Sequence, residues 1–77
     1  MKIYIFADME GCSGISTSEY INGSKAALGA SFMAQDINAC IAGCFDAGAK
    51  EVIVRDGHGC GVNLDPSLID PRATLIQ

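Results

Sequence analysis

The chain has 77 residues and a formal net charge of −4. Its five basic residues are scattered and form no positive stripe for phosphate contacts, so we expect no nucleic-acid partner. Hydrophobic residues make up 49% of the chain and charged residues 18%, which is more apolar than a small free-standing domain requires. We therefore expect either a homo-oligomer or the front part of a longer chain.

No apolar run approaches the roughly 20 residues that span a bilayer. The N-terminus leads directly into a strand pattern and lacks the basic, apolar and small-residue sections of a signal peptide. We expect no membrane contact, and a cytoplasmic location is the default expectation.

Residues 2–8 form an apolar run that predicts a strand buried on both faces, and this run leads into Asp8 and Glu10. If extended geometry persists to Glu10, both carboxylates point to the same side, because side chains alternate along a strand. Carboxylates held that close oppose each other's ionisation unless they spread into water, share a proton or bind a cation. Binding of a metal ion is the most specific of these options.

After a loop rich in turn-forming residues at 11–18, helical periodicity extends from about residue 25 to residue 47. Ser24 is expected to cap the helix at its N-terminus, and Gly48 to follow its C-terminus in a left-handed conformation. One face of this helix collects apolar residues at steps of three and four, namely Met33, Ile37, Cys40, Ile41 and Cys44.

Residues 51–55 have a β-branched centre and predict a second strand. Strand, helix and strand form a βαβ unit with parallel strands, so the fold class is α/β. Residues 56–61 should then lie at the same sheet edge as the two acids, where ligand sites of open α/β sheets gather. Further on, the pattern suggests a short helical turn at 66–69 and a short strand at 73–76.

This topology brings together Asp8, Glu10 and His58, which is the single histidine of the chain. Two carboxylates and an imidazole suit zinc or another divalent first-row metal. Asp56, two residues before the histidine, is expected to orient the imidazole of His58 as a hydrogen-bond acceptor. The competing interpretations are a structural histidine and an aspartate that only forms a turn.

Other chemistries receive weaker support. Cys12 and Cys60 each follow a strand near the expected site and could act as thiolate ligands or nucleophiles, whereas Cys40 and Cys44 are typical of small buried apolar residues. The glycine-rich segment 57–61 could hold a phosphate, but it lacks a GxGxxG or P-loop pattern and lies near acids. A serine hydrolase is disfavoured because no GxSxG motif is present.

Asp8-Met9-Glu10-Gly11, the helix segment 33–39, and the segments 47–49 and 51–59 together resemble the start of the M55 metallopeptidases, the DppA-type D-aminopeptidases. The resemblance implies a two-zinc site on a three-layer α/β domain. It also implies hydrolysis of short peptides with N-terminal D-amino acids, inside a ring-shaped homodecamer. Asp8, Glu10 and His58 match zinc-ligand positions of the family.

The chain departs from the family in its length. The family's domain is several times longer, and its other zinc ligands and its catalytic histidine come from later segments. Residues 1–77 are therefore expected to be a partial N-terminal segment of one metallopeptidase catalytic domain, inactive alone. The alternatives are a non-catalytic α/β assembly module and another metal-dependent hydrolase, acting on phosphate esters or amides.

Overall fold

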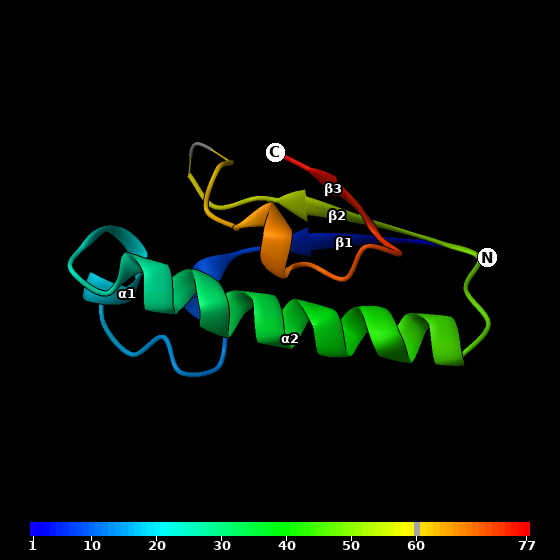
Figure 1. Ribbon diagram of the computed structural model, residues 1–77, viewed down its shortest axis with the longest axis horizontal. Coiled ribbons are helices and arrows are strands. Elements are labelled where there is room, and N and C mark those ends of the chain that lie inside the picture. Colours follow the sequence, from blue (N-terminus) through cyan, green and yellow to red (C-terminus); the bar gives the residue numbers. More distant parts are fainter. Residues whose placement is uncertain (60) are drawn as a thin grey trace.

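The structure is a computed structural model that describes residues 1–59 and 61–77. The expected βαβ unit is present, with a third strand and several short turns added (Figure 1). In chain order the elements are β1 (Lys2–Ala7), η1 (Met9–Gly11), α1 (Glu19–Asn22), α2 (Ala26–Asp46), β2 (Glu51–Asp56), η2 (Pro66–Leu68) and β3 (Thr74–Ile76).

The three strands form one parallel sheet in the order β1-β2-β3. Their arrows point the same way in Figure 1, and α2 runs along one face of the sheet. The register places Ala7 at the end of β1 opposite Asp56 at the end of β2. The segments that follow these two strands therefore leave the sheet at the same edge, as the sequence predicted.

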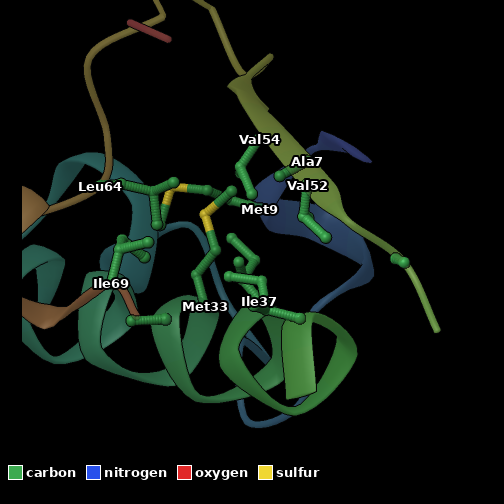
Figure 2. Packing of buried hydrophobic residues seen from close by; sticks show 11 residues of the cluster. Ala7, Met9, Met33, Ile37, Val52, Val54, Leu64 and Ile69 are labelled. Atoms are coloured by element: carbon green, nitrogen blue, oxygen red, sulfur yellow. The ribbon is translucent and has the colours of Figure 1, made fainter. Parts of the chain in front are cut away.

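The core lies between α2 and the sheet (Figure 2). Met33, Ile37 and Ile41 on the helix and Val52 and Val54 on β2 are all buried, which confirms most of the predicted helix face. Met9 of η1 also belongs to the core, as do Leu64 and Ile69, which lie before and after η2 in the chain.

The prediction that Cys40 is buried is wrong, because its side chain is exposed, while Cys44 is half-buried. The buried stripe of α2 also includes Ala34, which shifts its centre away from Cys40. Ala34 lies about 100° around the helix from Met33, so the sheet faces that side and leaves Cys40 at the margin.

The opposite face of the sheet carries large exposed apolar side chains. Tyr4 is 57% exposed and Phe6 is 65% exposed, and Ile76 on β3 lies on this open side as well. Parallel sheets in α/β proteins are normally covered on both faces. The structure thus shows two of the three expected layers, and the third layer stays a prediction.

The predicted helix boundaries are close to the observed ones. Lys25 occupies the N-cap position of α2 in place of Ser24, and Gly48 adopts the expected left-handed conformation with a φ of 101°. The short helix α1 was not predicted, because four residues are too few to show a period. No helix among the described residues has the length and apolar character needed to cross a bilayer.

Candidate metal centre

Asp8 and Glu10 emerge from the end of β1 through a turn. The strand ends at Ala7, and Met9–Gly11 forms a single 3-10 turn whose buried residue is Met9. Strand alternation does not extend to Glu10, so the assumed extended geometry is wrong there. The two acids instead lie on either side of Met9, whose burial in the core holds the turn in place.

His58 reaches the same place from the end of β2. The backbone N–H of Gly57 donates to the carbonyl oxygen of Ala7 at 2.8 Å, which carries the pairing of the strands one residue beyond the sheet. Nδ1 of His58 then lies 2.8 Å from Oδ1 of Asp8 and 2.7 Å from Oε1 of Glu10. The expected convergence of the three residues is confirmed.

The charges of this cluster depend on one another. The hydrogen bond to Asp8 is the main reason that the pKa of His58 lies above its ordinary value. The same hydrogen bond is the main reason that the pKa of Asp8 lies below its ordinary value. Both pKa shifts favour the charged forms, so a positive imidazolium lies beside the two carboxylates and compensates their charge. A bound metal cation would supply the same positive charge.

The donor set fits a divalent metal ion. Asp8, Glu10 and His58 each offer one ligand atom, and these atoms lie within 4.8 Å of one another. Two carboxylate oxygens and an imidazole nitrogen form a ligand set used by zinc in hydrolytic enzymes. The side chains of Asp8 and Glu10 are 56% and 66% exposed, which leaves room for further ligands and for a substrate. Metal ligation by these three residues stays a prediction.

The predicted contact between Asp56 and His58 is wrong. Asp56 is fully buried, and its carboxylate accepts hydrogen bonds from the backbone N–H groups of Asn63 at 2.6 Å and Leu64 at 2.7 Å. The side-chain amide of Gln77 donates to it at 3.1 Å. The side chain of Asp56 lies on the buried face of β2. Its carboxylate therefore points toward residues 63 and 64 and away from the imidazole of His58.

Asn63 connects Asp56 to His58 and was missed in the sequence. Its side-chain amide donates to Oδ1 of Asp56 at 2.8 Å and also to the carbonyl oxygen of His58. Burial opposes ionisation of Asp56, but the hydrogen bonds from Asn63, Leu64 and Gln77 outweigh it and keep its pKa below the ordinary value. The only sequence signal was an asparagine that closes a glycine-rich loop, where such residues commonly bind backbone groups.

The cysteines give little support to thiolate chemistry. The thiol of Cys12 donates to the backbone carbonyl of Asp8 at 3.3 Å, so it braces the turn. Burial, followed by the nearby charges of Asp36 and Asp8, raises the pKa of the Cys12 thiol and disfavours the thiolate form. The interpretation of Cys60 as a ligand or nucleophile lies outside the described residues.

One backbone amide of the glycine-rich segment is engaged within the segment itself. The backbone N–H of Gly61 donates to the carbonyl oxygen of His58 at 3.0 Å. This amide is therefore already used within the loop, and the carboxylates of Asp8 and Glu10 lie beside the histidine. The phosphate-cradle interpretation gains no support from this geometry.

Comparisons with known proteins identify the family to which the chain belongs. A family model described as peptidase M55, D-aminopeptidase, matches residues 1–77. A D-aminopeptidase of Bacillus subtilis strain 168 is 37% identical over 79 residues, which cover 100% of this chain and 29% of that protein. The solved structure of the Zn-dependent D-aminopeptidase DppA from Bacillus subtilis, a self-compartmentalizing protease, superposes with a TM-score of 0.96 at 35% identity. This match also covers 100% of the chain and 29% of the solved one, so the chain spans less than a third of these relatives.

Proposed function

Because the chain belongs to the M55 family of D-aminopeptidases, we propose that it supplies part of the zinc site of an aminopeptidase that releases N-terminal D-amino acids from short peptides. The observation that carries this proposal is the convergence of Asp8, Glu10 and His58, whose ligand atoms lie within 4.8 Å of one another. The family match supports the type of substrate. The chain covers 29% of its relatives, so the activity is proposed for the complete protein that contains residues 1–77.

The residues of this chain have separate tasks in that reaction. Asp8 and Glu10 would offer carboxylate oxygens and His58 an imidazole nitrogen. Zinc at such a site supplies a Lewis acid that polarises the peptide carbonyl and lowers the pKa of a bound water toward ~7. Asp8 follows β1 directly and would hold zinc through its carboxylate, while Asn63 holds the backbone of His58 in place.

Other parts of the complete protein must finish the site. Residues 1–77 contain one histidine, whereas the M55 resemblance implies two more, one as a ligand and one as a catalytic group. We propose that these groups come from further segments of the same catalytic domain. The self-compartmentalizing relative supports a homo-oligomer, and the open apolar face of the sheet is consistent with further packing. The decamer and the cytoplasmic location stay predictions.

Zinc titration by calorimetry tests the metal site directly. We expect saturable binding of zinc to the complete protein that contains residues 1–77, and we expect His58→Ala to weaken this binding about tenfold or more, because an imidazole ligand is lost. Glu19→Gln is the matched control, since Glu19 is an exposed acid on α1 outside the cluster. If the complete protein binds no zinc, or if its His58→Ala variant binds zinc as tightly as the wild type, the metal-site proposal is wrong.

Substrate profiling of the complete protein tests the reaction. We expect hydrolysis of dipeptides with an N-terminal D-residue, and we expect Asp8→Asn to remove bound zinc and activity together. Zinc content measured by atomic absorption separates loss of metal from loss of turnover. Full activity of Asp8→Asn would refute the role of Asp8. Hydrolysis of phosphate esters without peptide hydrolysis would favour the alternative metal-dependent hydrolase.

A further inference from the structure

The ring of Phe6 lies against the backbone of Gly57, the residue directly before His58. A Cβ atom added at Gly57 would lie 2.5 Å from Cζ of Phe6 and would also overlap Cε1 of the same ring. The ring therefore occupies the space that a side chain at position 57 would need. Because Gly57 has no side chain, an aromatic ring from β1 can rest on the segment that carries the imidazole.

The register of the sheet explains why these two residues meet. Phe6 of β1 pairs with Arg55 of β2, and both residues are exposed on the open face of the sheet. Gly57 follows Arg55 by two positions, so the alternation of a strand directs a side chain at position 57 to the same open face. Phe6 is thus the residue of β1 whose ring reaches across to the end of β2.

The core of the protein does not account for this ring. Phe6 is 65% exposed and takes no part in the buried cluster between α2 and the sheet. Tyr4, two residues earlier on the same face, is similarly exposed at 57%. The two rings differ in their place along the sheet, because Tyr4 pairs with Ile53 in the middle of β2, whereas Phe6 reaches Gly57 beyond its end.

The segment that carries the imidazole is restrained from both faces of the sheet. Gly57 lacks a Cβ atom, and glycine loses more conformational freedom on folding than any other residue type. The N–H of Gly57 donates to the carbonyl oxygen of Ala7 at 2.8 Å, and the side chain of Asn63 holds the carbonyl oxygen of His58 from the buried side. The ring of Phe6 limits the movement of the same segment from the open side.

We propose that Phe6 is a positioning residue of the candidate metal centre. Its ring restricts the backbone of Gly57 and thereby keeps the imidazole of His58 opposite the carboxylates of Asp8 and Glu10. The inference rests on the proposed zinc site and adds a residue that acts through the backbone rather than through a bond to the metal. It also gives a rule for position 57, which must stay glycine while position 6 carries an aromatic ring.

The test is zinc titration of the complete protein that contains residues 1–77. We expect Phe6→Ala to weaken zinc binding about tenfold, as is typical when a group that orients a metal ligand is lost. Tyr4→Ala is the matched control, because it removes a similarly exposed ring from the same strand and face, and it should bind zinc within about twofold of the wild type. If Phe6→Ala does not fold, Phe6→Leu replaces it, since leucine keeps an apolar side chain but lacks the ring atoms that reach Gly57.

Two further measurements locate the cause of the effect. In the metal-free protein, hydrogen exchange followed by mass spectrometry should show the amide of Gly57 exchanging about tenfold faster in Phe6→Ala, because its bond to Ala7 opens more often. In the cobalt-substituted protein, the visible absorption spectrum should change in Phe6→Ala and stay unchanged in Tyr4→Ala, because it reports the ligand geometry.

A size exchange between the two positions gives an independent test. Gly57→Ala adds a methyl group that overlaps the ring of Phe6, and we expect it to weaken zinc binding about tenfold or more. The double variant Phe6→Ala/Gly57→Ala removes that overlap and should bind zinc more tightly than Gly57→Ala alone. The recovery should be partial, because the new Cβ would also lie 2.9 Å from the carbonyl oxygen of Ala7.

The outcomes separate this inference from the function on which it rests. If the wild type binds zinc and Phe6→Ala binds it equally well, the positioning role of Phe6 is overturned and the metal site stands. Equal losses in Phe6→Ala and Tyr4→Ala would overturn it too, because the effect would then come from general packing on the open face. A wild type that binds no zinc would overturn both proposals. Weaker binding in Phe6→Ala with an unchanged control, together with recovery in the double variant, supports the positioning role.

Discussion

The side-chain amide of Asn63 joins the buried carboxylate of Asp56, 2.8 Å away, to the backbone carbonyl of His58. The side chain of Asn63 thereby links the last residue of β2 to the segment that presents the imidazole. Since Asp56 is fully buried, the loop is tied to the interior of the molecule. The imidazole is held opposite Asp8 by this connection together with its own contacts to the two acids.

Asn63→Ala is expected to weaken zinc binding about tenfold, because groups that orient metal ligands typically contribute factors of about 10 to 100 in affinity. The variant removes the side-chain hydrogen bonds to Asp56 and to the backbone of His58, keeps the backbone hydrogen bond to Asp56, and leaves the side chains of the proposed ligands unchanged. Zinc titration measures the effect. Asn22→Ala on the exposed surface of α1 is the control and should bind zinc as the wild type does. Wild-type affinity in Asn63→Ala would contradict the positioning role of Asn63.

Asp56→Ala is expected to lower the free energy of unfolding by about 3 kcal/mol, since the donors it leaves inside the protein cost about 1 to 3 kcal/mol each when unpaired. Urea denaturation followed by circular dichroism measures this change. Asp46→Ala, at the exposed end of α2, should stay within about 0.5 kcal/mol of the wild type. Equal losses in the two variants would show that the hydrogen bonds of Asp56 are not what stabilises the loop.

Gly29→Ala and Gly43→Ala place the same methyl group on the same helix with opposite expected results. At Gly29 the new Cβ meets the carbonyl of Tyr20, and we expect a loss of about 1 to 3 kcal/mol as α1 is displaced. At Gly43 the new Cβ meets no atom within 4 Å apart from its own helix backbone, so the higher helix propensity of alanine should add about 0.5 to 1 kcal/mol. Thermal unfolding of both variants gives the comparison, and a stabilised Gly29→Ala would disprove the close packing of the helices.

Stability should fall in acid partly through Asp70. The guanidinium of Arg72 donates to its carboxylate at 2.8 Å, and this hydrogen bonding is the main reason that the pKa of Asp70 lies below its ordinary value. A carboxyl with a lower pKa in the folded state stabilises the fold above its unfolded pKa of about 3.9 and loses that contribution as the pH falls through the folded pKa.

The corresponding experiment compares Asp70→Asn with the wild type by urea denaturation between pH 7 and pH 2. The wild type should be the more stable protein at neutral pH, and the difference should disappear in the acid range. Glu19→Gln serves as the control and should follow the wild type across neutral pH. A difference that persists unchanged to the lowest pH would show that the charge of Asp70 is not the cause.

The amino-acid sequence by itself determined the topology and, through it, most of the candidate metal centre. Two apolar runs separated by a long amphipathic helix allow one simple arrangement, in which the strands are parallel and end at the same edge. Asp8 and His58 follow those runs directly, so their meeting required no knowledge of side-chain packing. Met33, Ile37 and Ile41 were likewise predictable, because helical spacing alone puts them on one face.

Tertiary structure alone decided the features that depend on segments far apart in the chain. Glu10 reaches His58 because the burial of Met9 bends the chain into a turn, and strand alternation could not reveal that bend. The partners of Asp56 come from Asn63 and Gln77, and the position of α1 depends on its close contact with Gly29. Local sequence patterns show only periodicity. These contacts depend on which polar groups become buried when the core forms, because buried polar groups must find hydrogen-bond partners within the protein.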